Sequence, residues 1–361
     1  MRQNQMTNHW ATASVLACFS LIAACASERD KLVGAGVPVG IGGAMGTGGA
    51  LSTGGALSTG GAPNTGGEGT SIVTTGGSTA IGDGGAILVA PDSGVPTSRG
   101  KYVAMGSSYA AGPKIPDAVP DQSCGRSTSN YAHLVAADVG LDLTEVSCIG
   151  ATIDNVAATP QTINPLQIDA VTPDTRVITI TIGGNDVNYS SSLIACGRDG
   201  LNGKSCLEAS ADAAAPDVDS ATIDTLLNQE VSKLVAMLGQ LRQAAPAARI
   251  YLVAYPMVLP DPAVPCPPDV PMLAADATFL GGLGARLQVA FSAAAAMAGV
   301  TFVDWYGPSR GHDACAPADQ RWVEGQANSA VAPYHPNAAG MRAVADLIVA
   351  EIRKTSSSKP Q

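Results

Sequence analysis

Strand-like and helix-like segments alternate between residues 100 and 355, and this alternation constrains the fold more than any other feature of the chain. Residues 177–182 are β-branched at every position, as in a strand that is buried on both faces of a sheet. From Ile223 to Leu241, apolar residues recur at helical spacing. This order predicts a parallel sheet covered by helices on both faces, a three-layer α/β/α sandwich of the flavodoxin-like type. The expected strands are 102–105, 177–182, 250–254 and 301–305, and the expected helices cover 223–241, 276–297 and 337–353.

Polar and glycine-rich turns follow the first two of these strands. In a doubly wound sheet, ligands bind at the carboxyl ends of the strands. Residues 106–108 (Gly-Ser-Ser) and 183–186 (Gly-Gly-Asn-Asp) occupy that position, and neither has the GxGxxG spacing of a dinucleotide site. Residues 203–205 (Gly-Lys-Ser) lack the first glycine of a Walker A motif, because Arg198 stands there. Nucleotide binding therefore has no support.

Charge and cysteine spacing exclude two further classes. The chain has 30 acidic and 20 basic residues, a net charge of −10, so it lacks the cationic surface that nucleic acid requires. The eight cysteines form no CxxC pair, and no His, Cys or acidic cluster has the spacing of a metal site. We expect no nucleic-acid partner, no metal and no cofactor.

The N-terminus has the pattern of an export signal. Residues 11–24 form an apolar run that is too short to span a bilayer and suits the core of a signal peptide. The run ends in Leu-Ile-Ala-Ala before Cys25, which is similar to the bacterial lipobox, in which the cysteine is lipidated. We expect residues 1–25 to be a signal peptide and Cys25 to anchor the protein to a membrane of the cell envelope, facing outward from the cytoplasm. Secretion without an anchor is the alternative.

Glycine dominates the segment that follows. Residues 34–100 hold 22 of the 41 glycines, with a six-residue near-repeat that begins at Thr47 and again at Thr53. Such a segment buries too little apolar surface to offset its ordering entropy. We expect 26–100 to be a disordered linker, 101–355 to be the folded domain and 356–361 to be a short tail.

Four motifs in the folded region resemble those of the SGNH hydrolase superfamily, also called GDSL esterases and lipases, and specifically its secreted, disulfide-containing esterase subgroup. Residues 106–109 resemble the first block, with Ser107 where most members carry Asp and with Ser108 as the nucleophile. Residues 148–152, 182–186 and 333–337 are similar to the later blocks, and they supply Gly150, Asn185 and His335. Each pattern is weak alone, whereas four in order form a specific signal.

The resemblance implies a serine hydrolase of the same α/β fold. A serine hydroxyl needs a neighbouring base, and the pKa of histidine suits that task near neutrality. His335 would therefore activate Ser108. The backbone N–H groups of Ser108 and Gly150 and the side-chain amide of Asn185 would form the oxyanion hole, in which each donor is typically worth about 100- to 1000-fold in rate. We expect Ser107 to be a hydrogen-bonding turn residue, although it is the rival nucleophile.

One position departs from the family pattern. The usual last block is Asp-x-x-His, whereas Ala332 stands three residues before His335. Some members of the subgroup use a main-chain carbonyl instead of the aspartate, so the resemblance implies a Ser-His dyad in which the carbonyl of Ala332 accepts the Nδ1 proton. Asp313 is the rival third member.

Six cysteines remain when Cys18 is assigned to the signal peptide and Cys25 to the anchor. In an exported protein we expect them to form disulfides. The resemblance to the subgroup implies sequential pairing, namely Cys124 with Cys148, Cys196 with Cys206, and Cys266 with Cys315.

We therefore expect an exported, monomeric serine esterase or lipase that acts on a lipid, an acetylated glycan or a small ester. A non-catalytic surface-binding or adhesion module on the same scaffold is the alternative, and the presence of Ser108, Gly150, Asn185 and His335 together argues against it. An α/β-hydrolase lipase is excluded because residues 106–110 lack the final glycine of GxSxG.

Overall fold

The computed structural model describes residues 100–120, 122–162, 164–207, 220–327 and 331–357. The chain divides into two units, Met1–Leu88 and Val89–Gln361, and every described residue belongs to the second. The expected signal peptide, the lipidation site at Cys25, the linker up to residue 99 and most of the tail lie outside the described residues.

Five parallel strands form one sheet in the order β2-β1-β3-β4-β5. This is the flavodoxin-like order, so the predicted fold class is confirmed. The strands are β1 (Lys101–Gly106), β2 (Asp142–Glu145), β3 (Thr175–Thr181), β4 (Arg249–Val253) and β5 (Thr301–Val303). Because β2 and β3 lie on opposite sides of β1, the strand order reverses there, and a crevice for ligands is expected at the carboxyl ends of β1 and β3.

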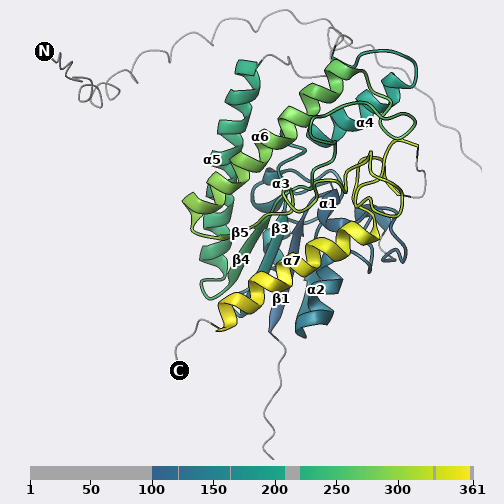
Figure 1. Ribbon diagram of the computed structural model, residues 1–361. Coiled ribbons are helices and arrows are strands. Elements are labelled where there is room, and N and C mark those ends of the chain that lie inside the picture. Colours follow the sequence, from purple (N-terminus) through teal and green to yellow (C-terminus); the bar gives the residue numbers. More distant parts are fainter. Residues whose placement is uncertain (1–99, 121, 163, 208–219, 328–330, 358–361) are drawn as a thin grey trace, which may run out of the picture. The chain divides into compact units, whose positions relative to one another are not determined.

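Helices cover both faces of the sheet (Figure 1). Helix α2 packs beside α7 and α5 beside α6, with α3 against α5 and α4 against α6. The helices are α1 (Ser108–Ala111), α2 (Tyr131–Val139), α3 (Ile153–Ala157), α4 (Tyr189–Gly200), α5 (Ser220–Ala244), α6 (Ala274–Ala298) and α7 (Ala338–Ser357), and there are short 3₁₀ turns at Gln122–Cys124 and Gln167–Ala170.

Along the central strands, side chains alternate between two buried cores. On β1, Val103 and Met105 join the core beneath α5 and α6, whereas Tyr102 and Ala104 join the core beneath α2 and α7. This follows from the two-residue period of a strand. Helix α6 is long and apolar enough by composition to cross a membrane, but its buried face, which includes Leu280, Leu287 and Phe291, belongs to the first core.

Strand β2 is an element that the sequence did not predict. Its residues are Asp-Leu-Thr-Glu, and its side chains alternate between exposed and half-buried because it forms the edge of the sheet. An edge strand needs few apolar residues, so the pattern that identifies the central strands is missing here.

Three disulfides join Cys124 to Cys148, Cys196 to Cys206 and Cys266 to Cys315. The sequential pairing implied by the family resemblance is therefore confirmed.

Candidate active site

Ser108 is the first residue of α1, immediately after the carboxyl end of β1. Gly106 makes this turn possible: its φ is +126°, and a Cβ there would lie 2.2 Å from the carbonyl oxygen of Thr181 at the end of β3. A residue with a side chain does not fit that space. Ser108, 6% exposed, therefore lies just beyond the carboxyl end of β1, beside the end of β3.

Ser107 is buried, and its polar groups bond within the protein. Its backbone N–H donates to the carbonyl of Thr181 at 2.8 Å, and its hydroxyl lies 3.3 Å from the hydroxyl of Tyr255. Tyr255 in turn accepts a hydrogen bond from the N–H of Gly184 at 2.9 Å. Ser107 thus connects the first and third motifs inside the protein, as a turn residue would.

His335 lies in the loop before α7, with its Nε2 2.8 Å from the Oγ of Ser108. These residues are 227 positions apart, and the fold brings them within hydrogen-bond distance. The Nδ1 atom lies 2.7 Å from the carbonyl oxygen of Pro333. With a proton on Nδ1, the ring presents a lone pair on Nε2 to the serine hydroxyl.

The carbonyl of Ala332 was the expected acceptor for Nδ1, and that expectation is wrong. This oxygen accepts the backbone N–H of His335 at 3.2 Å instead. Tyr334 has a φ of +58°, and this reversal of the chain leaves the carbonyl of Pro333, two residues before the histidine, facing the ring. A main-chain carbonyl does orient the imidazole, but it is the carbonyl of Pro333 and not that of Ala332.

Among the described residues, Asp313 forms neither a hydrogen bond nor an ion pair with His335. Its carboxylate accepts the N–H of Cys315 at 2.9 Å, beside the Cys266–Cys315 disulfide. This bond gives Asp313 a structural role in the loop.

The imidazole of His335 is buried, and only 5% of the residue is exposed. Its ring centroid lies 4.7 Å from that of Tyr109, whose hydroxyl donates to the carbonyl of Tyr334 at 2.5 Å. Loss of solvent lowers the pKa of His335 to about 4, although the hydrogen bond to Pro333 opposes this shift. The ring is therefore neutral near pH 7 and can accept a proton.

The expected oxyanion donors lie in segments that follow β1, β2 and β3. Within the described residues, the N–H groups of Ser108 and Gly150 have no acceptor, the first because it begins a helix. Gly150 has a φ of +72° in the exposed loop that contains Cys148. The Nδ2 of Asn185 donates to the carbonyl of Ala151 at 2.8 Å, which places this amide next to the loop of Gly150.

Two acidic residues are associated with the Asn185 loop: Asp186 belongs to the loop, and Glu230 packs against it. Asp186 accepts the N–H of Ile153 at 3.0 Å, and burial raises its pKa to about 6. Glu230, on α5, is 2% exposed and faces Gly183, and burial raises its pKa to about 9. Glu230 was not predicted from the sequence, because it lies in a helix that was identified from the spacing of its apolar residues alone.

One group in the described residues has the composition of a metal site. Potential ligand atoms of Cys196, Cys206 and Asp276 lie within 4.8 Å of one another. The two cysteines form a disulfide, and Asp276 accepts hydrogen bonds from the hydroxyl of Ser205 and the N–H of Cys206. These bonds attach the segment around Cys206 to helices α4 and α6, so the group has a structural role.

Comparison with known proteins shows the family of this chain. Residues 104–343 match the model of the GDSL-like lipase/acylhydrolase family. The chain is similar to Lipase 2 of Streptomyces coelicolor, with 35% identity over 287 residues that cover 77% of this chain and 94% of that protein. It is also similar to a lipase of Streptomyces rimosus, with 27% identity over 66% of this chain and 81% of that protein.

Two solved structures share the fold. Phospholipase A1 from Streptomyces albidoflavus has a TM-score of 0.56 and 22% identity, with 70% of this chain and 99% of that chain covered. The extracellular lipase from Streptomyces rimosus has a TM-score of 0.51 and 24% identity, with 70% and 98% covered. At these identities the similarity concerns the fold alone.

Proposed function

Because the chain belongs to the GDSL-like lipase/acylhydrolase family and is a carboxylic ester hydrolase, we propose that it cleaves esters with a Ser108–His335 dyad whose ring is oriented by the carbonyl of Pro333. The observation that carries the proposal is the 2.8 Å distance between Nε2 of His335 and Oγ of Ser108. A hydroxyl at this distance from a neutral imidazole is positioned for general-base activation.

The reaction proceeds in two steps. Ser108 Oγ attacks the ester carbonyl while its proton moves to Nε2 of His335, and the carbonyl oxygen becomes an oxyanion. The N–H groups of Ser108 and Gly150 and the amide of Asn185 stabilise that charge. The imidazolium then protonates the departing alcohol, which leaves an acyl-serine. Water, activated by the same histidine, releases the carboxylic acid and regenerates Ser108.

The carbonyl of Pro333 supports this cycle without a full negative charge. It fixes the tautomer and the orientation of His335, which are the chief tasks of a triad aspartate. It stabilises the imidazolium less than a carboxylate would.

The substrate and the location of the enzyme are also proposals. Two similar proteins are named lipases and one solved structure of the same fold is a phospholipase A1, so we propose an acyl ester of a lipid as the substrate class. Three disulfides and the signal-like N-terminus support export. In this proposal, 101–355 is the catalytic domain, 26–100 is a tether and Cys25 is the lipid-bearing residue.

The paired serines provide the test. Ser108→Ala should abolish hydrolysis of a p-nitrophenyl ester, because it removes the nucleophile. Ser107→Ala should keep a substantial fraction of the activity, because that hydroxyl faces Tyr255. Rates and melting temperatures of both variants decide the matter: a folded, inactive Ser107→Ala beside an active Ser108→Ala would disprove the proposed nucleophile.

A further inference from the structure

We propose that Gln161 is a positioning residue for the oxyanion hole, because its side chain holds the peptide group that carries the N–H of Gly150. The inference rests on the proposed role of Gly150 as an oxyanion donor. It concerns a residue outside the four family motifs.

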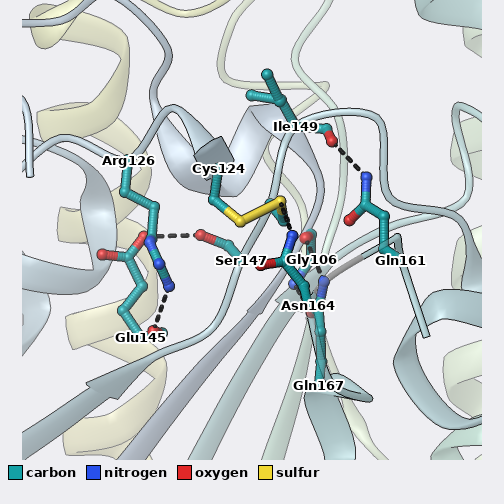
Figure 2. The surroundings of a disulfide bond; sticks show 10 residues. Gly106, Cys124, Arg126, Glu145, Ser147, Ile149, Gln161, Asn164 and Gln167 are labelled. Atoms are coloured by element: carbon teal, nitrogen blue, oxygen red, sulfur yellow. Dashed lines mark hydrogen bonds between the residues drawn. A yellow bond between two sulfur atoms is a disulfide. The ribbon is translucent and has the colours of Figure 1, made fainter. Parts of the chain in front are cut away.

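The contact is a hydrogen bond from Nε2 of Gln161 to the carbonyl oxygen of Ile149 at 2.7 Å (Figure 2). A carbonyl oxygen can only accept, so the nitrogen of the Gln161 amide must face it. The carbonyl of Ile149 and the N–H of Gly150 belong to one planar peptide group. In a trans peptide the two point in opposite directions, so a bond that fixes one of them also fixes the other.

This peptide group needs such a restraint. Gly150 is exposed, has a φ of +72° and belongs to neither a helix nor a strand, while Ile149 is 39% exposed. A glycine adopts left-handed and right-handed conformations with similar ease, so rotation of the preceding peptide meets little steric resistance. Such a rotation would turn a carbonyl oxygen toward the oxyanion in place of the N–H.

The hydrogen bond also acts electrostatically. A donor on the carbonyl side of a peptide polarises the group and strengthens its N–H as a donor. Gln161 therefore both orients the N–H of Gly150 and increases its partial positive charge.

The segment that carries Gln161 is itself attached to the site. The N–H of Asn164 donates to the carbonyl of Gln161 at 2.8 Å, and Nδ2 of Asn164 lies 3.4 Å from Sγ of Cys148. Gln167 is buried and binds Gly106 twice: its Oε1 accepts the N–H at 2.7 Å, and its Nε2 donates to the carbonyl at 3.0 Å. Gln161 and Asn164 therefore contact the loop of Gly150, and Gln167 contacts the strand end before Ser108 (Figure 2).

The opposite side of the Gly150 loop is restrained by different contacts. The carbonyl of Cys124 accepts the N–H of Ile149 at 3.1 Å, and the Cys124–Cys148 disulfide closes this side. The hydroxyl of Ser147 donates to Glu145 at 2.7 Å. These bonds restrain residues 147–149 up to the N–H of Ile149. The carbonyl of Ile149 is restrained by the side chain of Gln161.

The test is Gln161→Met, which keeps the length of the side chain and removes the amide. With a soluble p-nitrophenyl ester, kcat should fall by about 10- to 100-fold, while KM stays within about twofold. This fall in kcat is no larger than the one caused by removing a whole oxyanion donor. An alkylboronic acid, which forms a tetrahedral adduct with the active serine, should bind more weakly by a similar factor. A purely structural role would lower the melting temperature without moving inhibitor affinity and kcat together.

Gln288→Met is the matched control. Gln288 lies on α6, is half-buried like Gln161, and donates through Nε2 to Asp304 at 2.8 Å. Its loss removes a side-chain amide hydrogen bond of similar length, to a carboxylate that has no part in the proposed site, so kcat and inhibitor affinity should stay at wild-type values.

Gln161→Glu decides the matter if the methionine variant fails to fold. It keeps the shape of the side chain but replaces the donor by an acceptor near pH 7.5, so kcat should fall at least tenfold. Wild-type kcat and inhibitor affinity in a folded Gln161 variant would overturn the inference, as would a rise in KM with unchanged kcat. Asn185→Ala, measured in parallel, separates the two proposals: if that variant keeps full activity, the oxyanion hole itself is wrong, whatever Gln161 does.

Discussion

His335 is buried, and its Nδ1 faces an uncharged acceptor, the carbonyl of Pro333. Both features determine how the activity of the enzyme should depend on pH. The pKa of His335 is lowered from 6.5 to about 4, chiefly by loss of solvent. Only the neutral ring accepts the serine proton, so kcat/KM should remain nearly constant as the pH falls through 6.5 and should decline only toward pH 4 to 5. The measurement is a kcat/KM profile with a non-ionising ester, restricted to the pH range in which circular dichroism shows folded protein.

An acid limb at pH 6.5 or above would contradict this prediction. It would mean that a negative charge stabilises the imidazolium, since a carboxylate next to a histidine raises its pKa.

Asp313 provides a second prediction at the scale of single residues. Asp313→Asn should lower kcat by no more than about tenfold, because the carboxylate accepts the N–H of Cys315 and the substitution leaves the tautomer of His335 unchanged. The same change in a true triad acid costs on the order of 10⁴. Steady-state kinetics and a melting curve suffice, and a fall of about 1000-fold at normal stability would assign the orienting role to Asp313.

The site residues show how far the sequence could lead. Ser108 and His335 were recognisable because family motifs surround them, although no spacing along the chain shows that their side chains meet at 2.8 Å. The choice of Ala332 failed because the acceptor depends on the local backbone at Tyr334, and sequence does not encode that φ angle in any simple way. Nothing in the sequence indicated a role for Gln161, since a single glutamine in a loop has many possible hydrogen-bond partners.

At the scale of elements, α5 places a carboxyl group in the core behind the Asn185 loop. Both side-chain oxygens of Glu230 are buried, and neither has a hydrogen-bond partner in the described residues. Burial raises the pKa of Glu230 from 4.5 to about 9, while Asp186 adds to the shift. Between these pH values the folded protein keeps the proton that the unfolded chain releases. Folding stability attributable to Glu230 therefore falls as the pH rises from 4.5 to 9.

Glu230→Gln removes this titration. At pH 8 the variant should be more stable than the wild type by at least about 1 kcal/mol, since one pKa unit corresponds to about 1.4 kcal/mol, and the difference should shrink toward pH 5. Urea unfolding at both pH values measures it. Glu351→Gln on α7, where the carboxylate pairs with Lys354, should change stability little at either pH. A gain from Glu230→Gln that does not depend on pH would contradict the assignment.

The elements themselves differ in how well the sequence predicts them. Central strands such as β3 were predicted because burial on both faces demands continuous apolar and β-branched residues. The edge strand β2 and the short helices α3 and α4 were missed, since half-exposed elements tolerate polar residues and leave no regular pattern. The family motifs nevertheless located the loops of the site: two of these loops follow the predicted strands β1 and β3, whereas the Gly150 loop follows β2 and was found from its motif alone.

At the scale of the whole molecule, the last prediction concerns the N-terminal segment, which lies outside the described residues. Metabolic labelling with a palmitate analogue should mark the protein, and Cys25→Ala should remove the label and release soluble enzyme. Cys25 precedes Ser108 by 83 positions, across a segment with 22 glycines in residues 34–100, so the released enzyme should keep the wild-type kcat/KM on a soluble ester.

Activity against vesicles should fall in the variant, because the tether concentrates the catalytic domain near a membrane surface. An unlabelled, soluble wild-type protein would exclude the anchor and favour simple secretion, while the three disulfides would still require an oxidising compartment for their formation.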